Sequence, residues 1–183
     1  MHLWKWCLTS KSTSYSIVRN IACGYLGVPP EQIHLRYLPS GKPFFHGIKL
    51  HFNLSHTDGK VLAAFAIFLI GVDIENHSRS VSASKIADRY FHFSERIALA
   101  TCSEEERRKL FLRMWVQKEA TVKMAGDRIA SGLQKVKLTV NACPWKCHRD
   151  GRKIYIQEII PWQGMVGALA ARCPFVVITF PAL

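Results

Sequence analysis

The chain has 183 residues, 49% of them hydrophobic and 21% charged, a globular composition that excludes a disordered or fibrous protein. Its formal net charge of +12 favours an anionic partner, but charge alone does not choose among nucleic acid, a phosphate-rich small molecule and an acidic protein. The longest apolar run, residues 61–72, is shorter than the stretch of about 20 residues that crosses a bilayer. The first residues show no secretory signal, so we expect a cytoplasmic protein with no membrane partner.

The first half of the chain is expected to hold one helix followed by short strands. Apolar residues at Ile17, Ile21 and Tyr25 follow helical periodicity, which predicts a helix over residues 14–26 that Gly27 ends. The later segments are a strand at 33–37, a turn at 40–43, a strand at 50–54, and two strands at 61–68 and 70–74 that we interpret as a hairpin.

The second half is expected to hold helices and then strands. The strongest helix begins at the capping-box pair Ser103 and Glu106 and runs to Gly126. The other segments are helices at 84–90 and 95–100, the latter capped by Ser94, and strands at 135–140, 153–160 and 166–171. These lengths predict an α+β fold of two lobes, residues 1–70 and 71–183, each an antiparallel sheet with helical cover.

The cysteines and basic residues argue against two other classes of protein. Six scattered cysteines are interpreted as reduced thiols, because a chain of this size does not need disulfides. Cys143, Cys147 and His148 suggest a zinc site, but no fourth ligand follows at a regular spacing, so we expect no structural zinc. The basic residues are dispersed and the aromatic residues mostly fall at apolar-periodic positions, so we expect no nucleic-acid partner.

Two carboxylates stand on the strand Gly71–Glu75. Asp73 and Glu75 are two residues apart, so their side chains leave the same face, while Val72 and Ile74 point toward a core. Neighbouring negative charges need solvent or a cation, and oxygen ligands favour a hard ion such as Mg²⁺. On these residues alone, the alternative is an exposed strand end with two ordinary acids.

Two further segments carry polar side chains whose roles the spacing leaves open. Trp115, Glu119 and Lys123 share one helix face, where Glu119 and Lys123 have the spacing of a surface ion pair unless the fold brings Glu119 to the strand carboxylates. Ser55 and His56 follow a strand and suit a phosphate contact, whereas adjacent residues seldom form a nucleophile–base pair, which argues against a serine hydrolase.

Taken together and in this order, the motifs resemble the 4′-phosphopantetheinyl transferases, in particular the large monomeric class that activates surfactin-type peptide synthetases. The motifs are GKP at 41–43, FNLSH at 52–56, GVDIE at 71–75 and WVQKEA at 115–120, with Lys123 following. Any one of them is weak, but the ordered set is specific. The resemblance covers the chain from about Val18 to Lys123, and GMVGALAA at 164–171 fits the family's closing strand.

The resemblance implies a pseudo-twofold pair of α+β lobes with coenzyme A bound in the cleft between them. It implies that Asp73, Glu75 and Glu119 bind Mg²⁺ at the pyrophosphate of coenzyme A. The other positions it carries over are Ser55 and His56 at the 3′-phosphate, Lys42 and Pro43 beside the adenine, Lys123 at the pyrophosphate, and Glu95 as an acidic residue that assists catalysis.

The implied reaction transfers the 4′-phosphopantetheine group from coenzyme A to a serine of an acyl or peptidyl carrier protein and releases 3′,5′-ADP. Glu119 is the expected base and Glu95 the second candidate. An acidic carrier protein and a monomeric enzyme are expected. The alternative is a catalytically impaired homologue that binds coenzyme A or the carrier, because only Lys5 and Lys11 precede the first helix where this class generally carries more basic sequence.

Overall fold

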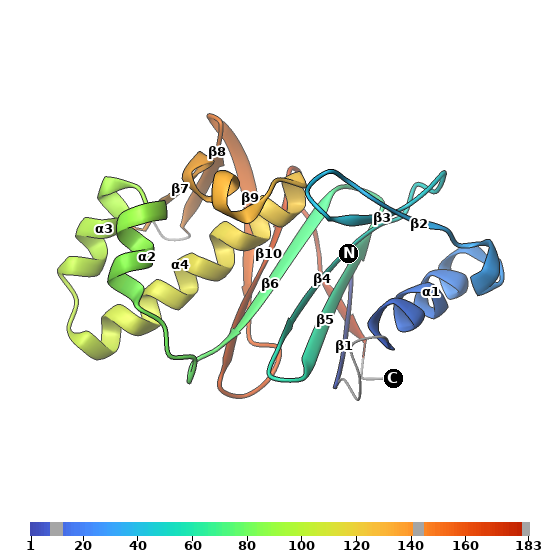
Figure 1. Cartoon of the computed structure of the whole chain (residues 1–183), viewed down its shortest axis with the longest axis horizontal. Helices are drawn as coiled ribbons and strands as arrows, with labels where there is room; N and C mark the ends of the chain where they lie inside the picture. The colour runs from blue at the N-terminus through green and yellow to red at the C-terminus, as the bar shows by residue number, and fades with distance from the viewer. Residues whose placement is uncertain (8–12, 141–144, 181–183) are drawn as a thin grey trace.

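Two β-sheets, each with helices on one face, make up the protein, as the computed structural model shows for residues 1–7, 13–140 and 145–180 (Figure 1). The first sheet has the strand order β11-β1-β5-β4 and the second the order β6-β10-β9-β8-β7, and β2 pairs separately with β3. The strands are β1 (His2–Cys7), β2 (Leu35–Tyr37), β3 (Pro43–Phe45), β4 (His51–Thr57), β5 (Lys60–Ala66), β6 (Ile70–Asn76), β7 (Val136–Thr139), β8 (Lys146–Arg149), β9 (Arg152–Ile159), β10 (Met165–Ala171) and β11 (Ile178–Phe180). The helices are α1 (Thr13–Leu26), α2 (Ala83–Tyr90), α3 (Phe93–Ala100), α4 (Glu104–Ala125) and α5 (Ile129–Gly132), with short 3₁₀ turns at Pro30–Gln32 and Leu133–Lys135.

The first sheet packs against α1. Val18 and Ala22 of α1 are fully buried against Phe52, Val61 and Phe65 from β4 and β5, because the strands alternate and present these side chains to the helix. α1 covers the periodicity predicted for residues 14–26, which is confirmed.

The second sheet packs against α4, with α2 and α3 beyond it at the left of Figure 1. Ser103 and Glu106 form the predicted capping box, in which the Ser103 hydroxyl accepts a hydrogen bond from the Glu106 amide. Gly126 follows the helix in the left-handed conformation, with φ of 77°. The long helix is therefore confirmed at both ends.

The two sheets meet along β4 and β6, with side chains in place of a backbone ladder. The Val72 amide donates to Asn53 Oδ1 (2.8 Å) and the Ile74 amide donates to Ser55 Oγ (3.2 Å). A third apolar core joins the faces of the two sheets that lie opposite the helices, and it contains Leu62, Ala64, Ile70, Val72, Ile74 and Leu169. β5, β6 and β10 are consequently buried on both faces.

The predicted hairpin of residues 61–68 and 70–74 is wrong. β5 pairs with β1 and β4, whereas β6 pairs with β10. The hairpin that does form joins β4 to β5 through Asp58 and Gly59, both at positive φ (49° and 71°), which is the Asp-Gly signal of a tight two-residue turn.

Two smaller differences concern element ends. α3 begins at Phe93 after His92, one residue before the predicted cap Ser94. β11 comes from the C-terminal part of the chain but pairs in parallel with β1, so the first sheet draws on both sides of the predicted boundary at residue 70. The α+β class is confirmed, while the boundary and the pseudo-twofold relation stay predictions.

Three negative observations apply to the part of the chain that the structure describes. None of its helices is long and apolar enough to cross a membrane. Its five cysteines, Cys7, Cys23, Cys102, Cys147 and Cys173, are all free thiols. Cys143 and Lys11 lie outside the described residues, so the expectations that rest on them stay predictions.

Candidate active site

Asp73 and Glu75 lie on β6, on the face opposite Val72 and Ile74, whose side chains enter the core between the sheets. Both acids are almost completely buried, at 3% and 5% relative exposure. The interpretation of an exposed strand end with two ordinary acids is therefore wrong. Buried carboxylates need partners, and the partners come from β4, from α4 and from the segment that follows β6.

Asp73 is at the centre of a small polar group. Its Oδ1 accepts hydrogen bonds from Ser55 Oγ (2.8 Å) and from Lys123 Nζ (2.6 Å). Ser55 Oγ in turn accepts from Lys123 Nζ (3.2 Å) and from the Ile74 amide. Asp73 Oδ2 is buried and has no hydrogen-bond partner among the described residues.

Glu75 pairs with Arg79, a residue that sequence reasoning missed. Glu75 Oε1 forms an ion pair with the Arg79 guanidinium, and Glu75 Oε2 is buried without a partner in the described part of the chain. Arg79 stands four residues after Glu75, but in a loop rather than a helix. Its spacing therefore carried no signal of a contact.

Glu119 lies on α4, where Lys123 contacts both it and Asp73. Its Oε2 is 3.9 Å from Lys123 Nζ on the next helical turn. Desolvation raises the pKa of Glu119 to about 7, the negative charge of Asp73 adds to that rise, and Lys123 and Arg79 oppose it. The group thus holds three carboxylates and two cations close to the junction between β4 and β6.

The carboxylates of this group are of the chemical type that binds a magnesium ion, and in this structure Asp73 is paired with Lys123 and Glu75 with Arg79. In residues 1–7, 13–140 and 145–180, no three or more His, Cys, Asp or Glu side chains stand together as a metal site. Asp73 Oδ2 and Glu75 Oε2 are nevertheless buried acceptors without donors, and an oxygen-only donor set is the one that Mg²⁺ prefers. The carboxylate oxygens of Asp73, Glu75 and Glu119 are therefore of the ligand type that a hard divalent cation prefers.

A cavity of about 540 Å³ lies next to this group, between the two halves of the molecule. One wall is the turn of residues 39–43, which includes Lys42 and Pro43, and the other holds Lys123 and residues 126–129. A second cavity of about 300 Å³ shares Pro43, Asn53 and Leu54 with the first and is also lined by His56. The two cavities form adjoining parts of one surface, with room for an extended ligand.

Ser55 and His56, the two residues predicted to contact a phosphate, differ in how accessible they are to a ligand. His56 is exposed and lines the smaller cavity. Ser55 is 3% exposed, and its hydroxyl already donates to Asp73 and accepts from Ile74 and Lys123. Ser55 therefore connects β4 to the carboxylates, whereas His56 is free to face a ligand.

Lys42 does not point its ammonium group into open space. Nζ donates to the carbonyl oxygens of Ile70 (3.2 Å), Lys123 (2.5 Å) and Met124 (3.2 Å). Burial lowers the pKa of Lys42 to about 8, while the three carbonyl oxygens and the C-terminal end of α4 favour its charged form.

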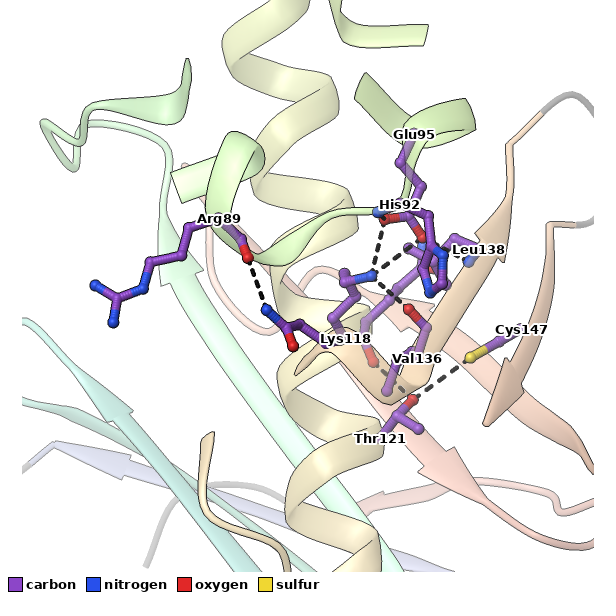
Figure 2. A network of polar contacts seen from close by, with 10 residues as sticks. Arg89, His92, Glu95, Lys118, Thr121, Val136, Leu138 and Cys147 are labelled. Carbon is purple, nitrogen blue, oxygen red and sulfur yellow. Dashed lines mark hydrogen bonds and ion pairs between the residues drawn. The ribbon is translucent and has the colours of Figure 1, made fainter. Parts of the chain in front are cut away.

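Glu95 lies in a different environment, inside the C-terminal half (Figure 2). It and Lys118 are both 0% exposed, and Lys118 Nζ donates to both Glu95 oxygens (3.1 and 2.8 Å) and to the Val136 carbonyl. The amides of Leu138 (2.7 Å) and His92 (2.9 Å) also donate to Glu95. Its carboxylate is fully paired and contacts none of Asp73, Glu75 and Glu119 in the described hydrogen bonds and ion pairs, so Glu95 lies apart from that carboxylate group.

The fold and the site define an α+β protein with a group of carboxylates where its two sheets meet, beside two adjoining cavities. Comparison with known proteins gives the family. The model of the 4′-phosphopantetheinyl transferase superfamily matches residues 69–157, and the chain belongs to this superfamily.

Three relatives illustrate the extent of the similarity. The 4′-phosphopantetheinyl transferase HetI of Nostoc sp. is 32% identical over 159 residues, which cover 84% of this chain and 67% of the relative. The transferase gsp of Aneurinibacillus migulanus is 34% identical over 110 residues (60% and 45%), and Sfp of Bacillus subtilis is 27% identical over 137 residues (74% and 57%). The chain thus matches between about half and two thirds of the length of these relatives.

Proposed function

We propose that this protein transfers the 4′-phosphopantetheine group of coenzyme A to a serine hydroxyl of an acyl or peptidyl carrier protein. The observation that carries the proposal is the group of the buried acids Asp73 and Glu75 with the partly buried Glu119 and Lys123, drawn from β6 and α4 of a superfamily member and lying beside the cavity. Such a group suits a reaction in which negative charge moves between phosphates.

In the proposed reaction the carrier serine oxygen attacks the β-phosphorus of coenzyme A. A bond forms between the serine oxygen and phosphorus, and the bond from phosphorus to the bridging oxygen breaks, so that 3′,5′-ADP leaves with the electron pair. Glu119 is the proposed acceptor of the serine proton, because it is a carboxylate that lies beside Asp73 and Lys123 at the edge of the cavity. Lys123 places positive charge where the leaving phosphate gains negative charge.

Asp73, Glu75 and Glu119 are the residues that would hold Mg²⁺. The ion, when bound, supplies a positive charge that polarises the phosphoryl oxygens and orients the pyrophosphate. Ser55 keeps Asp73 Oδ1 in place by its hydrogen bond, which leaves Oδ2 as the unpaired ligand atom.

Coenzyme A would occupy the two adjoining cavities. Pro43 lies on both of them and His56 on the smaller one, which supports the assignment of His56 to the 3′-phosphate and of Pro43 to the neighbourhood of the adenine. We further propose an acidic carrier partner, in line with the net charge of +12, and a monomeric enzyme that acts in the cytoplasm.

The test is the intact mass of an unmodified carrier protein after incubation with the protein, coenzyme A and Mg²⁺. We expect a gain of one phosphopantetheine that disappears with EDTA and with Asp73→Ala. No gain across several carrier types, despite measurable coenzyme A binding, would reject the transferase in favour of a binding protein. A gain that persists in EDTA would reject the magnesium assignment alone.

A further inference from the structure

Lys42 connects the two halves of the molecule through one side chain. It lies in the turn between β2 and β3, which packs with the first sheet through Phe45. Its Nζ reaches the first residue of β6 and the last turn of α4, where it donates to the carbonyl oxygens of Ile70, Lys123 and Met124. Figure 1 shows the β2–β3 segment extending over the C-terminal end of α4.

The end of α4 is built to receive this side chain. The last carbonyl groups of a helix have no partner within the helix and carry partial negative charge, so an ammonium group there satisfies both needs. A Cβ atom at Gly126 would lie 2.8 Å from Leu38 Cδ1, so the β2–β3 turn packs directly against the helix end. On the other side, a Cβ atom at Gly71 would clash with the carbonyl oxygen of Ala120, so the β6 backbone also contacts α4.

The ammonium group of Lys42 has no donor left for a ligand. A lysine carries three N–H donors, and in this structure three carbonyl oxygens accept them. This differs from the role expected from the resemblance, in which Lys42 stands beside the adenine as a binding residue.

Lys123 is held at both of its ends. Lys42 contacts its backbone carbonyl at 2.5 Å, and its own Nζ contacts Asp73 at 2.6 Å. The same Lys42 side chain joins the two walls of the 540 Å³ cavity, the turn of residues 39–43 and the segment 126–129 that follows α4.

We propose that Lys42 is a positioning residue, which fixes the C-terminal end of α4 against the β2–β3 turn and thereby sets the reach of Lys123 to Asp73. Its effect on turnover rests on the proposed transferase function, whereas its effect on the helix end does not.

The test compares Lys42→Met with the matched control Lys49→Met, which removes one exposed lysine from the same half of the molecule. For Lys42→Met we expect amide hydrogen exchange in the last turn of α4 to rise about tenfold or more, because the carbonyl groups of Lys123 and Met124 in that turn each lose an ammonium contact. At saturating coenzyme A, and well below the melting temperature, kcat falls about tenfold while the Kd for coenzyme A changes less than about threefold. Lys42→Arg, which keeps a charged donor, recovers part of kcat, and Lys49→Met changes none of these.

Two results would overturn the inference. One is unchanged hydrogen exchange in Lys42→Met. The other is a Kd for coenzyme A that weakens about tenfold while kcat is unchanged, which is the signature of a direct ligand contact. If the unmodified protein transfers no phosphopantetheine, the proposed function fails, and the exchange measurement on the unliganded protein still decides whether Lys42 holds the helix end.

Discussion

α4 carries charged side chains on two adjacent residues, the buried Lys118 and the partly buried Glu119, and their surroundings differ in how completely they are paired. Lys118 points into the C-terminal half, where it and Glu95 share all their hydrogen bonds with each other and with the backbone of α3 and β7. Glu119 points to β6, where Asp73 and Glu75 each keep a buried oxygen without a partner in the described residues. We call a group saturated when all its polar atoms have hydrogen-bond partners and unsaturated when some do not. A saturated pair such as Lys118 and Glu95 makes the fold rigid, whereas an unsaturated group of carboxylates can still bind a ligand.

The cost of removing each charged group from water explains why the surroundings of Lys118 and Glu119 differ. Burial lowers the pKa of Lys118, and the Glu95 charge opposes that shift, so each ion depends on the other to remain charged in the interior. At Glu119 the main neighbour after desolvation is another carboxylate, and the pKa rises. The Lys118–Glu95 pair therefore needs no further partner. The carboxylates of Glu119, Asp73 and Glu75 are stabilised when an additional cation binds near them.

The largest effect that separates the two groups is expected for Glu119→Gln. It removes the proposed base, so kcat should fall by a factor of about 10² to 10⁴. The free energy of unfolding should not fall, because the variant relieves repulsion with Asp73. Single-turnover kinetics with a carrier protein and denaturant unfolding measure the two quantities.

Glu105→Gln is the matched control, since Glu105 is an exposed carboxylate at the opposite end of the same helix. It should leave both quantities unchanged. Near-normal turnover of Glu119→Gln at saturating Mg²⁺ would remove Glu119 from the reaction.

The next effect is expected at the saturated pair. Lys118→Met leaves Glu95 buried and unpaired, which should lower the free energy of unfolding by about 3–5 kcal/mol. A double variant with Glu95→Leu should recover part of this loss, and the coupling is measured by a double-mutant cycle in denaturant. Lys109→Met, which breaks an exposed ion pair on the same helix, should change stability little.

The turnover of a Glu95 variant gives a second test of how the saturated pair differs from the carboxylate group. If Glu95 is structural, Glu95→Gln should retain normal turnover per folded molecule. A stable Glu95→Gln variant with a large loss of kcat and a shifted pH profile would instead return Glu95 to the catalytic group, as the resemblance first implied.

The sequence predicted the parts of the site that depend on local spacing. The alternation along β6 placed Asp73 and Glu75 on one face, and the capping box and Gly126 placed both ends of α4. It could not predict the contacts between distant segments. Ser55 shows this limit, because its motif is equally compatible with a phosphate contact and with the bridge from β4 to Asp73 that the structure has.

The wrong hairpin has a related physical cause. Residues 61–68 and 70–74 are β-rich neighbours with a short connection, which locally favours pairing. The tight Asp58–Gly59 turn instead pairs β5 with β4, and β6 finds its partner β10 about ninety residues later in the chain. Spacing alone does not reveal that partner, nor the parallel pairing of β1 with β11.

A smaller effect tests how the unsaturated group is tied to the first sheet. Ser55→Ala removes a hydroxyl that donates to Asp73 and accepts from Ile74 and Lys123, which should lower the free energy of unfolding by about 1–3 kcal/mol. His56→Ala, at an exposed neighbouring position, should leave stability unchanged and weaken coenzyme A binding. The reverse pattern, a stable Ser55→Ala with weakened binding, would make Ser55 the phosphate ligand.

The last effect we expect is a pH dependence from Lys42, which stands between the two cases because it is partly buried and its described hydrogen bonds go only to uncharged carbonyls. Its pKa is lowered to about 8 in the folded protein, from an ordinary value of 10.5. Between these two pH values the unfolded chain binds more protons than the folded one, so this residue makes stability rise with pH over that interval. Lys42→Met abolishes the contribution, and the difference between the two proteins in free energy of unfolding should grow in favour of the unmodified protein from pH 8 to pH 10. A difference that is flat with pH would mean that the three carbonyl oxygens and the helix end hold the ammonium charged throughout, and would place Lys42 with the saturated pair rather than between the two groups.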